Sequence, residues 1–480
     1  MQQSGLLKLI NWGSVAAFFT IFGAMLLTVS LFGEPVPFFD EWDAEALLLY
    51  KPYIEGNLNL DGLITSHNGH RVIVTRITAL ILFMLNGGWD PELQMIVNAL
   101  LHALTGTFLI GLMQKQHHCQ FDRLDIVFAL VLFTIPFSSL SLLVAFQTQF
   151  YYMLLFAVGS LWALTSGKHF IGYLLATLSF LSMTPGAFVF PAYMAVLLIE
   201  IIRNRSVSQN LLCHLFICGL LFLLIILTRS TETSDETFRA QHFPGFAISF
   251  LAALSWPFRI GLGVGVIVYV PLFLFLVRAP FISHLPRYYF ALGIFLLLQI
   301  FAMAYFRGGE GVPPAERYWE ILRIGVWVNG VCLLILLQDV RLRLMKPLAL
   351  LWFIAIIFGL STLARYSLTV ALPERQAQSL QAQSLIVEFL DSSDSQIFQG
   401  ISGLNMSYPR ADILVQRLSD PTIRRVLPVS LNPENFDRLR HVKHWLLGLS
   451  SLLAIAGLGL FLNQTFSLLR LFNKSSNIRK

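Results

Sequence analysis

The chain has 480 residues, of which 56% are hydrophobic and only 12% are charged. Soluble domains carry roughly a quarter charged residues, so a soluble enzyme is excluded. Apolar stretches long enough to cross a bilayer recur along the sequence and predict a polytopic membrane protein. The net charge of +6 comes from basic residues scattered over short loops. This pattern indicates topology signals and excludes a nucleic-acid-binding face.

About twelve apolar segments are expected to cross the membrane as helices. They are residues 9–32, 93–113, 126–141, 145–165, 170–183, 187–202, 211–227, 260–277, 289–305, 318–337, 348–363 and 445–462. The sequence therefore predicts an all-α polytopic membrane protein with about 12 transmembrane helices.

One further apolar segment, 72–86 ("VIVTRITALILFMLN"), is short for a span and carries Arg76 near its start. Lys and Arg are enriched in short cytoplasmic loops, and this rule decides the status of the segment. If the segment does not cross, the short basic loops all fall inside; if it crosses, they all fall outside. The charge distribution thus favours a segment that lies at the interface, with both termini in the cytoplasm.

Three polar segments then share the outer face: a first loop (33–92), a short loop (307–317) and a longer segment (364–443). Helical apolar spacing in the last predicts a small helical subdomain. The chain is accordingly divided into a transmembrane module (1–363), the subdomain, and a last helix with a cytoplasmic tail (444–480).

Two amphipathic helices are expected at the membrane interface within the first loop. They are "EALLLYKPYI" and the segment 72–86. Trp42 and Trp89 flank them, and indoles are favoured in the headgroup region. We therefore expect both tryptophans to anchor the loop at the lipid headgroups.

Three carboxylates, Asp40, Glu41 and Asp43, follow the first span directly in "PVPFFDEWDAEALLLY". A carboxylate at this boundary can deprotonate an acceptor hydroxyl as a general base, and partial burial beside aromatic rings would raise its pKa. The alternative is that these acids are solvated and favour a helix N-terminus, where the helix dipole stabilises negative charge.

Basic and aromatic residues return to the same outer face. They are His67, His70 and Arg71 in "SHNGHR", then Arg76, and later Arg307, Arg317 and Tyr318. Arginine binds phosphate groups bidentately and can stabilise a phosphate leaving group. Arg71 and Arg76 can instead be snorkelling anchors. The two histidines leave open acceptor binding, a proton relay, a divalent metal site with the acids, or a turn around Gly69, and we assign no metal.

The order of these elements resembles the GT-C class of integral membrane glycosyltransferases, which includes protein O-mannosyltransferases and aminoarabinose transferases. The resemblance rests on a first span, an outer loop that opens with an Asp-Glu pair in "FFDEWD", and interfacial helices before the second span. "FFDEWD" followed by "HNGHR" is also similar to bacterial inner-membrane proteins of GT-C type. "ERYW" (316–319) and "SDPTIRRVLP" (419–428) add shorter similarities.

This resemblance implies an inverting transferase of the bacterial inner membrane with its active site facing the periplasm. It would move a sugar from a polyprenyl-phosphate-linked donor to a periplasmic or lipid-linked glycan acceptor. Asp40 matches the catalytic base and Glu41 its usual neighbour, while Arg317 and Tyr318 match the region that holds the donor phosphate. The remaining candidates for substrate binding are Asp43, His67, His70, Arg71, Arg76 and Arg307.

Two other functions stay open. An O-antigen ligase or polymerase also has about twelve spans with outer arginines and histidines, although its key loop usually lies late in the chain. A non-enzymatic lipid or polysaccharide transporter would carry paired charges at the membrane midplane, broken helices and often inverted repeats. No repeat relates the two halves of this sequence.

Overall fold

The computed structural model describes residues 12–115, 123–228, 238–258, 263–282, 285–309, 315–339 and 344–463. Within these ranges the chain is helical, and the only extended pairing is an isolated β-bridge between His67 and His70. The predicted all-α class is therefore confirmed.

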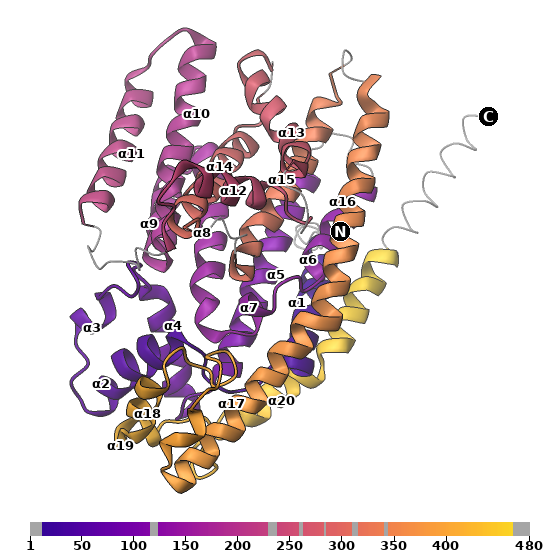
Figure 1. The fold of residues 1–480 in the computed structure, drawn as a ribbon. Helices are drawn as coiled ribbons and strands as arrows, with labels where there is room; N and C mark the ends of the chain where they lie inside the picture. Colours follow the sequence, from indigo (N-terminus) through magenta and orange to yellow (C-terminus); the bar gives the residue numbers. More distant parts are fainter. Residues whose placement is uncertain are drawn as a thin grey trace, which may run out of the picture.

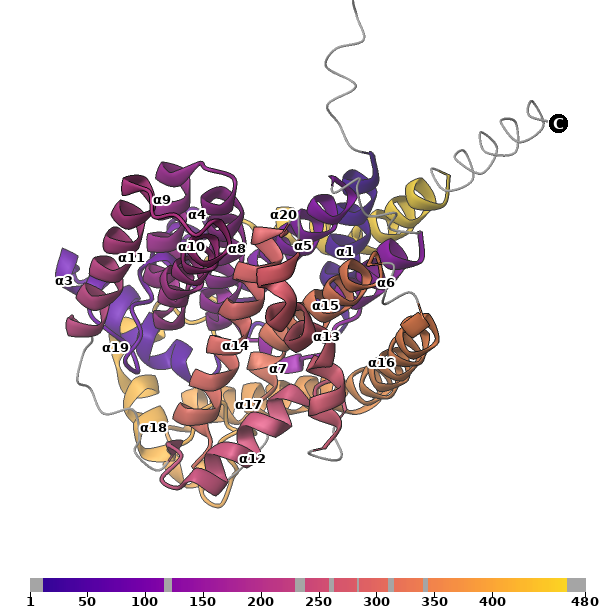
Figure 2. The same ribbon diagram turned by 90° about the horizontal axis from the view of Figure 1, so that it is seen from above.

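Long apolar helices form the body of the molecule (Figure 1). They are α1 (Trp12–Phe32), α5 (Pro91–Lys115), α6 (Arg123–Thr134), α8 (Thr148–Thr165), α9 (His169–Ser182), α10 (Val189–Asn204), α11 (Gln209–Leu227), α12 (Phe243–Leu254), α13 (Val264–Arg278), α14 (Arg287–Arg307), α15 (Trp319–Leu336) and α16 (Lys346–Tyr366). Short helices α7 (Ser139–Leu142), η3 (Ala145–Gln147), η4 (Thr184–Phe188), η6 (Ala279–Phe281) and η7 (Glu316–Tyr318) join them. Seen from above, α16 stands at the edge of the bundle (Figure 2).

Eight helices among the described residues are long and apolar enough to cross a membrane, or nine if the bent pair Arg440–Gly448 and Ser450–Asn463 is one span. The protein is thus a multi-pass membrane protein. The predicted spans at 126–141, 145–165 and 170–183 correspond to helices that are not among these eight. The figure of about twelve spans therefore stays a prediction.

Helix α16 does not end where the membrane module was predicted to end. It continues through a π-helical turn, η9 (Ser367–Ala371), into α17 (Leu372–Ser392), so that one helix of 47 residues runs from Lys346 to Ser392. Pro373 lacks the N–H that an α-helix would direct at Thr369, and a widened turn at that point accommodates this loss. The predicted boundary at 363/364 consequently lies inside a helix.

The first loop and the segment 364–443 fold against each other at one end of the bundle (Figure 1). The first loop forms η2 (Glu41–Tyr50), α2 (Lys51–Ile54), α3 (Leu60–Ile64) and α4 (Ile73–Asn86), and the later segment forms η10 (Ser395–Phe398), α18 (Ala411–Ser419), α19 (Pro421–Arg424) and the start of α20 (Arg440–Gly448). Apolar residues of both segments make one hydrophobic core. The later segment is thus joined to the first loop and does not form a core of its own.

Trp42 and Trp89 lie inside this shared core, so their predicted place among the lipid headgroups is wrong. Trp42 is 0% exposed and Trp89 is 2% exposed, and their rings meet edge to face at 5.5 Å. The indole N–H of Trp42 donates to the Pro37 carbonyl and to Ser407 Oγ, each at 3.2 Å. A buried indole needs such acceptors, and the later segment supplies one of them.

Helix α4 has the character expected of an interfacial helix. It has 14 residues and falls among the shorter apolar helices. Ile77, Ile81 and Met84 are exposed along one face, while Arg76 and Phe83 are buried on the other. This arrangement agrees with the prediction that 72–86 lies along the membrane instead of crossing it.

The last helix (450–463) packs closely against α1 through glycine. A Cβ atom at Gly457 would lie 2.4 Å from the Thr20 nitrogen, whereas a Cβ at Gly459 would meet no atom within 4 Å. We expect Gly457→Val to push the two helices apart and to destabilise the protein by about 1–3 kcal/mol. Thermal unfolding in detergent measures this loss.

Gly459→Val is the matched control, because it adds the same β-branched side chain to the same helix. Gly459→Val should melt within about 1 °C of the wild type, because only the small difference in helix propensity between Gly and Val acts there. Equal melting temperatures for the two variants would contradict the close packing.

Candidate active site

Asp40 is the residue directly before η2, and Pro35 and Pro37 lie between it and the end of α1. Its side chain is 36% exposed, and its Oδ1 atom lies 3.4 Å from His67 Nε2 and accepts a 3.2 Å hydrogen bond from Asn68 Nδ2. Burial raises the pKa of Asp40, but the hydrogen bond and charge of His67, followed by the charge of Arg317, bring it below the ordinary value. Asp40 is therefore ionised at neutral pH and able to accept a proton.

The "HNGH" sequence forms the tight turn that holds these partners. His67 and His70 exchange two backbone hydrogen bonds of 2.9 Å, and Asn68 and Gly69 have φ of +50° and +74°. Asn-Gly is the favoured pair for a type I′ turn, because both positions need positive φ. Thr184 Oγ1 donates to the Gly69 carbonyl at 3.0 Å and fixes the turn against η4.

Glu41 is fully buried and faces away from the exposed side of Asp40. Its carboxylate accepts hydrogen bonds from the Phe38 N–H at 3.1 Å and the Phe146 N–H at 3.3 Å. Burial, and then the charge of nearby Glu45, raises the pKa of Glu41 well above its ordinary value. With no exposed surface, Glu41 cannot contact a substrate here, and its observed contacts connect the first loop to η3.

The basic residues opposite Asp40 come from the short loop. Arg317 lies over the Tyr318 ring at 5.3 Å, and Arg307, in the last turn of α14, lies over the Phe238 ring at 5.1 Å. The Tyr318 hydroxyl interacts with both guanidinium groups. This places two cations beside one phenol, and Arg317 acts electrostatically on Asp40.

Glu316 and the short helix α7 hold this basic group in place. Glu316 Oε2 accepts hydrogen bonds from Ser139 N at 3.2 Å and Ser139 Oγ at 3.0 Å. Ser141 Oγ lies 3.4 Å from the carbonyl oxygens of Glu316 and Arg317. The backbone that carries Arg317 is therefore attached to the loop between α6 and α8.

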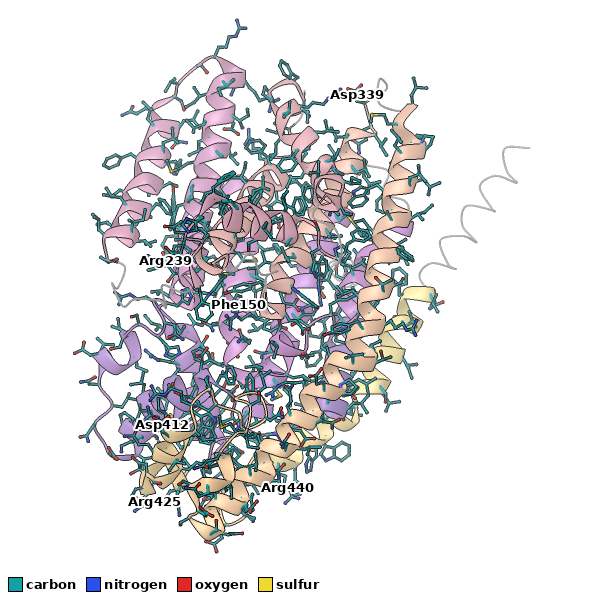
Figure 3. The ribbon with its side chains drawn as sticks, viewed as in Figure 1. Phe150, Arg239, Asp339, Asp412, Arg425 and Arg440 are labelled. Carbon is teal, nitrogen blue, oxygen red and sulfur yellow. The ribbon has the colours of Figure 1, made fainter. Side chains whose placement is uncertain are left out.

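A cavity of about 360 Å³ opens beside these residues, between α8, η4, α11, α14 and α15. Phe150 lines it near the middle of the molecule (Figure 3). Four polar or charged side chains gather among its lining residues: Asn68, His70, Arg307 and Tyr318. Most of the remaining wall is apolar: Phe150, Met183, Pro185, Ala187, Phe188, Phe222, Ile225, Ile226, Ala302, Met303, Phe306 and Ile321, with Thr184 and Gln299. Asn68 belongs both to this cavity and to the contacts of Asp40.

Three predicted substrate-binding residues have structural partners instead. Asp43 accepts hydrogen bonds from Tyr408 Oη at 2.5 Å and Arg417 Nη2 at 3.1 Å, which fasten the later segment to the first loop. Arg76 is 0% exposed and donates to the Gly62, Leu63 and Thr65 carbonyls around the end of α3. Arg71 donates to the Ile64 and Thr228 carbonyls.

The physical reason is the same for all three. Helix ends and loop carbonyls need hydrogen-bond donors, and a half-buried carboxylate is stabilised by a cation. Asp43, Arg71 and Arg76 meet these needs of the surrounding chain. Of the predicted site residues, the structure thus brings together Asp40, His67, His70, Arg307, Arg317 and Tyr318.

Two features were missed from the sequence. The first is Asn68, for which no role was predicted, although an Asn-Gly pair between two histidines indicates a tight turn with an exposed amide. The second feature is a buried ionic cluster inside the bundle. Glu320 lies 3.1 Å from His102 Nδ1 and 3.4 Å from Arg323 Nη2, and Arg323 Nη1 lies 2.8 Å from His102 Nε2. No local sequence pattern joins His102 to a residue more than two hundred positions away.

Among the described residues, no three or more His, Cys, Asp or Glu side chains come together in a way that can hold a metal ion. Comparison of the chain with protein-family models, with curated proteins and with solved structures gives no match.

The buried pair Glu41 and Glu45 gives stability a defined pH dependence. Burial raises the pKa of Glu45 from 4.5 to about 7. The folded protein therefore holds this proton more tightly than the unfolded chain, and stability falls as pH rises from about 4.5 to about 7, by about 3 kcal/mol. We expect Glu45→Gln to remove this fall, so that the variant melts above the wild type at pH 8 and near it at pH 5.

Thermal melts of both proteins between pH 5 and pH 8 measure the effect. Glu388→Gln, on the exposed side of α17, is the control and should follow the wild type at every pH. A Glu45→Gln protein with the wild-type pH profile would show that Glu45 is not protonated in the folded state.

Proposed function

We propose that this protein is a membrane glycosyltransferase that uses a polyprenyl-phosphate-linked sugar as donor. The observation that supports it is the apolar cavity with Asn68, His70, Arg307 and Tyr318 among its lining residues, next to the ionised Asp40. A long isoprenoid tail needs an apolar groove, and its phosphate needs cations at the lipid boundary. Few other ligands need both in one site.

The proposed chemistry is a single displacement with inversion. Asp40 takes the proton of the acceptor hydroxyl as its oxygen bonds to the anomeric carbon of the sugar. The bond between that carbon and the phosphate oxygen breaks, and the lipid phosphate leaves with the electron pair. Arg307 and Arg317 stabilise the charge that develops on the phosphate, and Tyr318 lies between them to fix their positions. His67 and Asn68 orient the Asp40 carboxylate.

The proposed setting is the bacterial inner membrane, with both termini in the cytoplasm and about twelve spans. The short basic loops then lie inside and the Asp40 end of the bundle faces the periplasm. Asp40, Arg307 and Arg317 all lie at helix ends on that side. An acceptor glycan, free in the periplasm or linked to lipid, would approach the exposed side of Asp40.

The alternatives fit the site less well. In a transporter, paired charges within the membrane are expected to change partners. Here His102, Glu320 and Arg323 contact one another and the Phe133 and Ile135 carbonyls, which favours a structural role. An O-antigen ligase or polymerase shares the chemistry of a lipid-phosphate leaving group, and the identity of the acceptor separates it from the leading proposal.

Asp40→Asn tests the proposed base. The amide has nearly the same shape but cannot accept the proton, so we expect sugar transfer from the lipid donor to fall at least 100-fold. Transfer is measured with the purified, folded variant and a radiolabelled polyprenyl-phosphate sugar. Asp61→Asn, at an exposed position of the same loop, is the control and should keep wild-type activity. Undiminished transfer by Asp40→Asn would remove Asp40 from the chemistry.

Ala302→Phe tests the proposed lipid groove. Ala302 lines the cavity, and a phenyl ring there would occupy space needed by the isoprenoid tail. Overfilling a packed site costs about 1–3 kcal/mol, so the KM for the lipid donor should rise about tenfold or more while the KM for the acceptor stays constant.

Phe301→Trp changes the neighbouring side chain, which is 55% exposed on the outside of α14, and it should leave both KM values unchanged. An Ala302→Phe enzyme with the wild-type KM for the donor would place the tail elsewhere.

A further inference from the structure

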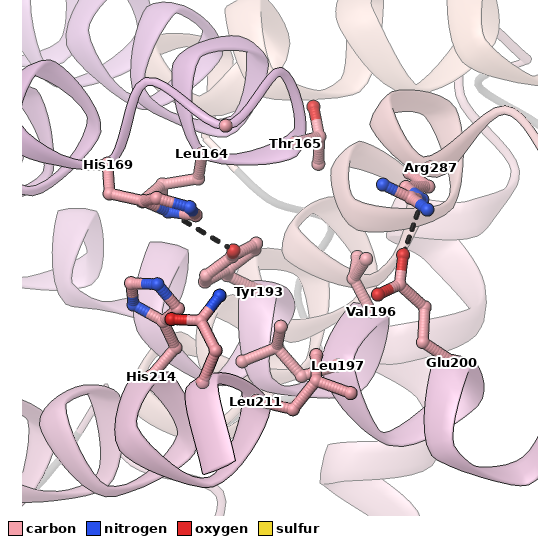
Figure 4. Close-up of a pocket in the computed structure, with 12 residues that line it drawn as sticks. Leu164, Thr165, His169, Tyr193, Val196, Leu197, Glu200, Leu211, His214 and Arg287 are labelled. Atoms are coloured by element: carbon pink, nitrogen blue, oxygen red, sulfur yellow. Dashed lines mark hydrogen bonds and ion pairs between the residues drawn. The ribbon is translucent and has the colours of Figure 1, made fainter. Parts of the chain in front are cut away.

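A second pocket, of about 150 Å³, lies at the opposite end of the bundle from Asp40, where α8 and α10 end and α9, α11 and α14 begin (Figure 4). Its polar wall consists of His169, Tyr193, Glu200, Asn210, His214 and Arg287. None of these residues takes part in the proposed transfer reaction. The pocket therefore calls for a separate explanation.

The rings of His169 and His214 are stacked, and Nδ1 of each ring lies near a tyrosine hydroxyl. Their ring centroids are 3.9 Å apart with an interplanar angle of 28°. His214 Nδ1 lies 2.9 Å from the Tyr173 hydroxyl, and His169 Nδ1 lies 3.5 Å from the Tyr193 hydroxyl. Because a tyrosine engages Nδ1 of each ring, Nε2 of each ring is the atom available to a ligand in this pocket.

Arg287 is the group through which this pocket can bind an anion. Arg287 Nε pairs with Glu200, which cancels that carboxylate, and the Arg287 side chain is still 54% exposed. A guanidinium has five N–H donors, so others remain for a ligand. The first turns of α9, α11 and α14 present the positive ends of their helix dipoles here, and the last turns of α8 and α10 present negative ends, so the dipoles oppose one another.

A larger space of about 310 Å³ adjoins the pocket, and Thr165 and Arg287 line both. Its other walls mix apolar and polar groups: Leu112, Trp162, Leu285 and Tyr288, with Ser166. The two spaces therefore share an arginine. An acyl chain joined to a phosphate at Arg287 has Leu112, Trp162 and Leu285 to pack against.

We propose that this pocket binds a phosphate group, carried by an anionic lipid or present as free phosphate. Two stacked imidazolium rings repel each other, and an anion held between their Nε2 atoms and Arg287 offsets that repulsion. A bound anion favours the protonated form of both rings, so binding is then linked to proton uptake by the histidines. The titratable and charged groups that face the pair are Tyr173, Tyr193, Glu200 and Arg287, with Cys218 3.7 Å behind the Tyr173 hydroxyl.

Calorimetric titration of the purified full-length protein in detergent tests this proposal. The probes are inorganic phosphate and dioctanoyl phosphatidic acid, with dioctanoylglycerol as the lipid that lacks phosphate. At pH 6 we expect phosphatidic acid or phosphate to bind, and dioctanoylglycerol not to bind. The affinity should be several-fold weaker at pH 8. Tighter binding of phosphatidic acid than of phosphate identifies a lipid ligand, and equal binding identifies free phosphate.

The variants are His169→Gln and His214→Gln, which cannot become positively charged. Each should weaken binding at least tenfold, because a charge-assisted hydrogen bond is lost. His441→Gln, an exposed histidine on α20, is the control and should bind as the wild type does. Absence of binding by both phosphate probes, or equal affinity in both pocket variants and the wild type, overturns the proposal. If a variant does not fold, a wild-type affinity that is the same at pH 6 and pH 8 overturns it.

Discussion

The position of Asp40 depends on the burial of its neighbour Glu41. A buried carboxylate needs hydrogen-bond donors, and Glu41 finds them in the backbone of Phe38 before it and of Phe146 in η3. These two bonds fix the chain where it leaves the first helix and bring it to the loop between α6 and α8. Arg375 of α17 lies 3.7 Å above the Phe38 ring and acts electrostatically on Glu41 from the other side. Three distant parts of the chain therefore meet at one buried acid, and Asp40 is the residue that this junction presents outward.

The site combines charges of both signs with an apolar cavity. Asp40 is kept ionised by His67 and Arg317, and the guanidinium groups of Arg307 and Arg317 lie over the rings of Phe238 and Tyr318. The hydrogen bonds of Glu316 with Ser139 attach the backbone of the short loop to α7. The proposed reaction would use a base for the acceptor and cations for the departing phosphate, and this site holds groups of both kinds.

Sequence patterns predicted the helical class, the short apolar helix α4 and the cluster at "FFDEWD" and "HNGHR" because these follow from local composition and spacing. They did not predict which acids and arginines turn outward. Asp43, Arg71 and Arg76 have the same chemistry as Asp40 and Arg317, and only the structure shows that they bind partners within the protein, such as Arg417 and the end of α3. The burial of Trp42 likewise depends on a segment more than three hundred residues away. The helix that continues through residue 363 depends on a π turn before Pro373.

The most direct measurement is an experimental structure of the protein with a polyprenyl phosphate bound. The account predicts density for the isoprenoid tail in the cavity lined by Phe188, Phe222 and Ala302, with the phosphate in contact with Arg307 and Arg317 on the side that faces Asp40. A phosphate bound away from these arginines, or a tail that lies outside this cavity, would contradict the account.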